Sequence, residues 1–202
     1  MIPMLQHPER AIISAQLRQN EVLKGMPDEI REELERTLTI VDGAKSDFLL
    51  SQGVREMEQY FILDGVLKRT VSNAEGKEMI LRFAAEGDME TSYAAWRMGT
   101  PTPYSIVCVT KARVARLPLP QWVDFLERHR ETKDLFESAV MRLMTEVMGH
   151  TITLHLLDAP GRVHRFLRKR PDRVDRIPQK QLAAHLNLSA ETLSRLRQRG
   201  KI

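Results

Sequence analysis

The side chains best suited to chemistry lie near the end of the chain, where Ser194, Arg195 and Gln198 follow Glu191 at offsets of three, four and seven residues. At this spacing the four residues share one face of a helix. Arginine can donate two hydrogen bonds to guanine O6 and N7, and a carboxylate can accept one from the cytosine amino group. We therefore predict a helix that reads base pairs in the major groove of DNA.

The surrounding stretch, 177–199, reads IPQKQLAAHLNLSAETLSRLRQR and has the leucine spacing of a helix-turn-helix. We predict helices at about 178–186 and 189–199. Asn187 lies at the turn, where the backbone must adopt positive φ, and Ser189 suits the N-cap of the second helix. An ordinary helical hairpin with a solvated charged face is the alternative.

Charge divides the 202-residue chain into two parts. The formal net charge is +4, but the stretch from Pro160 to the end carries +9 and the remainder −5. A basic module joined to an acidic one implies a polyanionic partner. Cys108 is the only cysteine, which excludes a disulfide framework or a cysteine-held iron–sulfur cluster within one chain. Since no segment resembles a signal peptide or a membrane span, we expect a cytoplasmic location.

The region of about 39–117 is predicted to be a compact β-roll. Glycines recur there every eleven or twelve residues between short apolar runs, as in an all-β sandwich or barrel. Met79, Leu81 and Phe83 alternate with Ile80 and Arg82, which favours a strand with one buried face.

A long helix is predicted at about 131–157, with apolar residues spaced alternately by four and three. Such a seam favours pairing with a second copy of the chain; packing against the chain's own β-roll is the alternative. Met144, Met148 and Thr151 broaden the apolar stripe, so one side can contact the roll while the other meets a partner. The predicted interface consists of Phe136, Val140, Leu143, Val147, His150, Leu154 and Leu157.

The order of these parts, with an LDAPGRV hinge, resembles the cyclic-AMP receptor and fumarate and nitrate reduction regulator (Crp/Fnr) superfamily of bacterial transcription factors. The resemblance covers nearly the whole chain and is most specific at IPQKQLAAHLNLSAETLSRLR. It implies an α+β fold with three parts. These are a cyclic-nucleotide-binding-like sensor domain at 1–130, which is a β-roll (double-stranded β-helix, jelly-roll-like), a dimerisation helix at 131–157 and a helix-turn-helix domain at 158–202.

The same resemblance implies a homodimer that binds palindromic DNA and has RNA polymerase as a further partner. Glu191, Ser194 and Arg195 look like the Glu-x-x-Ser-Arg triplet of the fumarate and nitrate branch, which implies TTGA-like half-sites. Gln179, Lys180 and Ser189 fall where backbone phosphates would be held. The DNA-binding set is Gln179, Lys180, Ser189, Glu191, Ser194, Arg195 and Gln198.

The sequence departs from the family in three places. Cyclic-nucleotide binders carry a Gly-Glu pair and an Arg-Ser or Arg-Thr pair, whereas here Ser92 falls where Glu should be, and Pro103 and Tyr104 where Arg and Ser should be. The four cysteines of the oxygen-sensing branch are absent, and the wing that follows the recognition helix is expected to be missing or vestigial. We therefore expect an unknown small-molecule effector other than cyclic AMP. Its predicted site is Met89, Glu90, Ser92, Tyr104, Ser105 and Met148.

No enzyme motif is found: there is no Gly-rich phosphate loop, nucleophile elbow or His-Glu-x-x-His. The β-roll region has no histidine, which argues against a cupin-type metal site, and no cofactor or metal is predicted. His150 could be a haem ligand or a pH-sensitive interface residue, although a packed, hydrogen-bonded histidine is the simpler interpretation. A different class of function remains open, namely a ligand-binding or protein-interaction module of the same fold that no longer reads DNA.

Overall fold

The first part of the chain forms a β-roll of two antiparallel sheets. The structure, a computed structural model, describes residues 1–169 and 171–198. Within them one sheet has the strand order β1-β2-β9-β4-β7 and the other β3-β8-β5-β6. The strands are β1 (Ile2–Pro3), β2 (Thr39–Gly43), β3 (Phe48–Leu50), β4 (Glu58–Asp64), β5 (Leu67–Ser72), β6 (Glu78–Ala84), β7 (Met89–Thr91), β8 (Ser105–Cys108) and β9 (Ala112–Pro118).

The glycine spacing predicted this roll correctly because the turns between strands need positive φ. Gly53, Gly65, Gly76 and Gly87 all have φ between 77° and 93°, a region that other residues rarely enter. At Gly65 a Cβ would also collide with the carbonyl oxygen of Lys111.

The burial of β6 does not follow a regular two-residue alternation. Met79 is exposed, whereas Ile80, Arg82 and Phe83 are all buried. The pairing of β5 with β6 shifts register between Arg69 and the next residue. Such an irregularity interrupts the two-residue period of a strand, so alternation along the sequence does not identify the inner face here.

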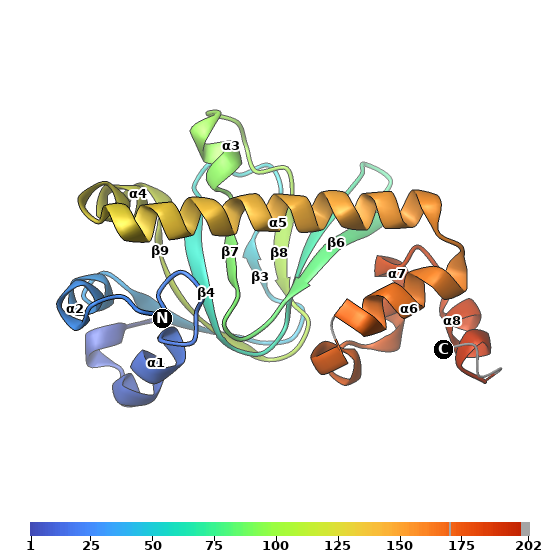
Figure 1. The fold of residues 1–202 in the computed structure, drawn as a ribbon, viewed down its shortest axis with the longest axis horizontal. Coiled ribbons are helices and arrows are strands. Elements are labelled where there is room, and N and C mark those ends of the chain that lie inside the picture. Colours follow the sequence, from blue (N-terminus) through green and yellow to red (C-terminus); the bar gives the residue numbers. More distant parts are fainter. Residues whose placement is uncertain (170, 199–202) are drawn as a thin grey trace.

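Helices enclose the roll at both ends, and α5 runs along its whole length (Figure 1). α1 and α2 lie at one end and α6, α7 and α8 at the other. No helix among the described residues is long and apolar enough to cross a membrane. The helices are α1 (Arg10–Leu17), α2 (Asp28–Glu35), α3 (Tyr93–Arg97), α4 (Leu119–Arg128), α5 (Arg130–Leu156), α6 (Ala159–Lys169), α7 (Gln179–His185) and α8 (Ala190–Gln198), with short 3-10 turns at Met4–Gln6 and Pro171–Arg176.

The long helix was predicted correctly, but much of its apolar seam faces the chain's own roll. Phe136, Val140 and Leu143 are buried, and the first two share a hydrophobic cluster with Phe61 and Met89 of the roll. The assignment of these three residues to a dimer interface is therefore corrected: they belong to the core of one chain. Spacing alone could not show this, because a seam packs equally well on a β-roll and on a second helix.

The remaining predicted interface residues, Val147, His150, Leu154 and Leu157, are partly buried. A second apolar face of α5 is exposed instead. It consists of Met141, Met144, Met148, Ile152 and Leu156, and we call it the α5 stripe. Its residues follow one another at intervals of three or four, which places them along one side of the helix.

The helix-turn-helix is docked on the roll. A single hydrophobic cluster contains Val66, Ile80 and Phe83 from the roll together with Leu182 and Leu193 from the terminal helices. All five side chains are buried. The two parts therefore share one apolar core in this arrangement.

Candidate nucleic-acid interface

The local geometry of the helix-turn-helix confirms the sequence prediction. Asn187 has φ of 53° at the turn between α7 and α8. The Ser189 hydroxyl accepts a hydrogen bond from the Thr192 backbone N–H at 3.1 Å, which caps α8. Leu193 is completely buried, so the opposite face of α8 points outward.

That outward face carries the predicted reading residues. Glu191, Arg195 and Gln198 are exposed, and Ser194 is partly exposed. The backbone N–H of Glu191 and the Ser189 hydroxyl, together with the nearby charge of Arg195, hold the pKa of the Glu191 carboxyl below its usual range. This side chain is therefore a charged acceptor at neutral pH.

The predicted phosphate contacts also lie on the surface. Gln179 and Lys180 are exposed in the first turn of α7, and Ser189 is exposed where α8 begins. Arg199, the last residue of the predicted second helix, lies outside the described residues. The prediction about the wing also concerns that part of the chain.

Only Leu157 and Asp158 separate α5 from α6. The Asp158 carboxylate accepts a hydrogen bond from the Gly161 N–H at 3.0 Å, which caps the start of α6. The predicted hinge is therefore short, and Leu157, which is in an extended conformation, is its non-helical part.

Polar contacts hold the terminal helices against β6. Arg173 donates to the Phe83 carbonyl oxygen at 3.1 Å and pairs with Asp88 at 2.8 Å. Arg176 pairs with Glu86. Partial burial alone would raise the pKa of the Glu86 carboxyl, but this pairing helps to lower that pKa to about 2. The basic charge of the terminal module thus partly serves to dock it on the acidic roll.

His185 on α7 makes a further contact across the same boundary. Its Nδ1 lies 2.9 Å from the Ile80 carbonyl oxygen, and its ring stacks on that of His150. His150 is therefore packed against other residues of its own chain, although it is only partly buried. Its Nε2 is buried without a hydrogen-bond partner among the described residues, and the ring bonds instead to the backbone of His185, as expected for a packed, hydrogen-bonded histidine.

Inside the roll, a buried network of charges surrounds Glu90. Arg69 donates from Nε to one carboxylate oxygen at 2.9 Å, and Arg82 donates to the other at 2.6 Å. All three side chains are buried, and Glu90 is 0% exposed. The Arg69 guanidinium also lies 4.1 Å from the centre of the Tyr104 ring, within the range of a cation–π contact.

The network fills the site that the sequence assigned to an effector. Met89, Glu90, Ser92, Tyr104 and Ser105 are all buried. Their polar groups are bonded within the chain: Tyr104 donates to the Thr91 carbonyl oxygen, Ser92 pairs with Thr102, and Ser105 accepts from the Gln52 N–H. Met148 does not join them, because it lies on the exposed α5 stripe.

Sequence reasoning missed both arginines of this network. Arg69 and Arg82 lie on separate strands, and only the pairing of β5 with β6 places them opposite one another. A charged residue in the middle of an apolar strand was the available signal. Cys108 is buried, and burial together with the charge of Asp47 raises the pKa of its thiol to about 11.

Comparison with known proteins agrees with this architecture. Residues 42–129 match the cyclic nucleotide-binding domain family. The structure of FixK2 from Bradyrhizobium japonicum superimposes with a TM-score of 0.71 at 16% identity, covering 81% of this chain and 86% of that one. The chain has the fold of the Crp/Fnr regulators.

Two further Crp/Fnr structures show the same fold. The c-di-GMP responsive regulator CLP of Xanthomonas campestris gives a TM-score of 0.68 at 12% identity over 85% of this chain and 91% of that one. The catabolite activator protein of Thermus thermophilus gives 0.57 at 18% identity over 90% and 88%. No curated protein matches the chain at the sequence level. The Crp/Fnr resemblance therefore rests on the shared fold and on the family match in the roll.

Proposed function

We propose that the chain is a bacterial transcriptional regulator that binds palindromic DNA as a homodimer. The observation that carries this proposal is the outward face of α8, where Glu191, Ser194 and Arg195 are accessible while Leu193 anchors the helix. A helix with this composition and exposure fits the major groove. The fold shared with a catabolite activator protein and a c-di-GMP responsive regulator supports the same class of function.

The base contacts follow from the side chains on that face. Arg195 would donate to guanine and Glu191 would accept from cytosine, which suits the one G·C pair of a TTGA half-site. The exposed Gln179 and Lys180 would hold backbone phosphates and set the register of the helix. Affinity should therefore fall steeply as the salt concentration rises.

The proposed dimer forms through the α5 stripe. This face is apolar, runs along the longest helix and lies on the side of α5 that does not contact the roll. Pairing of two such helices about a two-fold axis would bury both stripes, and the same symmetry would present two α8 helices to a palindrome. Their separation would have to match the ~34 Å between successive major grooves.

The proposed signal is a change in how the terminal helices sit relative to α5. A rotation about Leu157 and Asp158 would move α8, because these two residues are all that joins α5 to α6. An effector would act through unequal affinity for the two arrangements. Cyclic AMP is not the proposed effector, since the side chains around Glu90 satisfy one another.

The experiment that tests this function is selection of binding sites from random duplex DNA by the purified chain, followed by measurement of affinity at several salt concentrations. We expect a two-fold symmetric sequence with TTGA-like halves and a linear fall of log affinity with log salt. Recovery of no symmetric sequence, together with an affinity that does not respond to salt, would contradict the proposal and favour a module of this fold that does not read DNA.

A further inference from the structure

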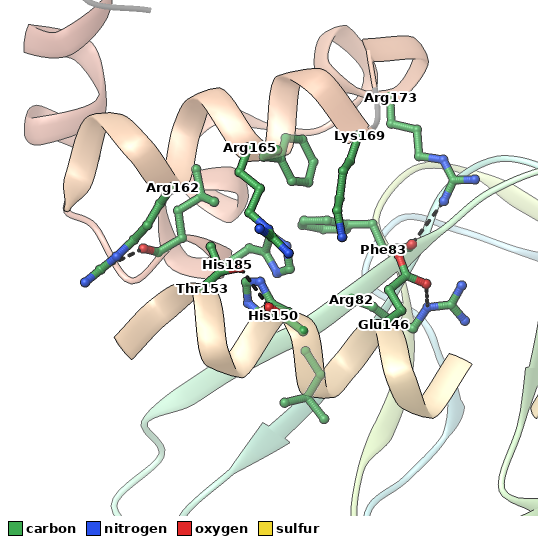
Figure 2. Close-up of a pocket in the computed structure, with 14 residues that line it drawn as sticks. Arg82, Phe83, Glu146, His150, Thr153, Arg162, Arg165, Lys169, Arg173 and His185 are labelled. Atoms are coloured by element: carbon green, nitrogen blue, oxygen red, sulfur yellow. Dashed lines mark hydrogen bonds and ion pairs between the residues drawn. The ribbon is translucent and has the colours of Figure 1, made fainter. Parts of the chain in front are cut away.

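A pocket lies between the roll and the terminal helices, in the angle between α5 and α6 (Figure 2). Its cavity volume is about 60 Å³. Such a space holds several water molecules, and it is smaller than the pockets of about 300 Å³ or more that enclose whole drug-sized ligands. It suits one small group, such as a phosphate, rather than a buried nucleotide.

The wall formed by α6 is strongly basic. Arg162, Arg165 and Lys169 all line the pocket, and the side chains of Arg165 and Lys169 extend from α6 towards α5 (Figure 2). Arg162 donates to the carbonyl oxygens of Leu157 and Leu186. Arg165 and Lys169, in contrast, make no hydrogen bond or ion pair with any residue that the structure describes.

The opposite wall provides little negative charge to balance these two cations. Glu146 is the acidic residue among those lining the pocket, and its carboxylate lies 3.6 Å from Arg82 Nε. Arg82 is itself held by Glu90, and Arg173 by Asp88. The pocket therefore keeps an excess of positive charge at Arg165 and Lys169.

A neutral polar group completes the lining. His150 reaches the pocket from α5, and its buried Nε2 has no partner among the described residues. The two cations beside this cavity favour an oxyanion, because a guanidinium can bind two oxygens of one phosphate while an ammonium binds a third.

We propose that this pocket binds the phosphate group of a small anion, either inorganic phosphate or a phosphomonoester. The anion would join α6 to α5 and β6, and would thus favour the docked arrangement of the terminal helices. The binding step stands without any assumption about DNA; only its regulatory meaning rests on the proposed function.

The test uses the full chain and a double variant, Arg165→Gln with Lys169→Gln. The matched control is Arg168→Gln with Arg36→Gln, which removes the same charge from exposed residues outside the pocket lining. Thermal unfolding and titration calorimetry are measured with inorganic phosphate and with glycerol phosphate, chloride being exchanged to keep ionic strength constant. Far-UV circular dichroism checks that each variant folds, and Lys169→Gln alone serves if the double variant does not.

We expect saturable binding and a rise in Tm for the parent chain and the control. The double variant should bind at least tenfold more weakly, and Lys169→Gln should fall between them. Response to inorganic phosphate alone identifies the free ion as the ligand, and response to both identifies the phosphate group as the recognised part. Equal responses of the double variant and the control, or no saturable response in the parent chain, would overturn the proposal.

A further measurement, of DNA affinity, distinguishes binding in this pocket from a direct contact of Arg165 and Lys169 with the duplex. In phosphate-free buffer the double variant should bind the selected DNA within about twofold of the control. A much larger loss would assign Arg165 and Lys169 to the DNA backbone and overturn the pocket proposal. Phosphate binding by a chain that selects no DNA sequence would leave the pocket in place and contradict the proposed function instead.

Discussion

The imidazole rings of His150 on α5 and His185 on α7 stack face to face, with centroids 3.9 Å apart and planes within 5°. Burial, reinforced by the charge that His150 would carry, lowers the pKa of His185 to about 3. Burial also lowers the pKa of His150. Two neutral rings can stack in this way, whereas two charged rings would repel one another.

Docking of the terminal helices should therefore weaken in acid. An undocked His185 titrates near its ordinary pKa of about 6.5, so it binds protons more readily than the docked one between about pH 6.5 and 3. The equilibrium constant for docking is therefore largest above that window. Within the window it falls by up to about tenfold per pH unit. Hydrogen exchange of the β6 amides at pH 7.5 and 5.5 measures how far docking weakens between these two pH values. Above pH 5 the carboxylate of Glu86, with its pKa of about 2, stays charged.

His185→Phe keeps a ring but removes the titratable group, so it should reduce the response between pH 7.5 and 5.5. His155→Gln, which changes an exposed histidine on α5, should leave the response intact. A response of the same size in His185→Phe as in the parent chain would show that this stacked pair does not control docking.

The charged network in the roll should be a large contributor to folding stability only while it is complete. Glu90→Ala leaves Arg69 and Arg82 buried without their shared partner, and we expect it to lower the free energy of unfolding by about 3–5 kcal/mol. Glu58→Ala, which removes the partner of a partly exposed arginine, should cost about 1 kcal/mol or less. Urea denaturation compares the two, and equal losses would contradict the argument.

Arg195→Ala should change sequence preference rather than only overall affinity. Loss of a bidentate contact to guanine costs about 1–3 kcal/mol at one base pair and leaves other positions unaffected. Arg197→Ala, on the same helix, is the control and should keep the preference. Fluorescence anisotropy measures the affinity of each variant for DNA altered at each half-site position. An unchanged guanine preference in Arg195→Ala would show that this residue does not read a base.

Met148→Lys should convert a dimer to a monomer, because it places two charges in the proposed interface between paired α5 stripes. Met98→Lys makes the same change at a similarly exposed methionine that lies outside α5 and should leave the assembly unchanged. Sedimentation velocity measures the mass of each variant. A parent chain that is monomeric at all concentrations, or a Met148→Lys dimer, would count against the stripe as the interface.

The amino-acid sequence by itself determined the local features of this protein. The positive φ of Asn187, the Ser189 cap, the glycine turns of the roll and the extent of α5 follow from short-range preferences that act over a few residues. The exposure of Glu191 and Arg195 on α8 follows equally from helical spacing and the burial of Leu193.

The tertiary structure decided which of two apolar faces of α5 meets the roll, since either face satisfies a helical repeat and only the shape of the roll selects Phe136 over Met148. It also decided that Arg69, Arg82 and Glu90 meet, through strand pairing and a register shift. The stacking of His150 on His185 depends on how the terminal helices dock. These contacts join residues far apart in the chain, and their energies depend on burial and distance that no local pattern encodes.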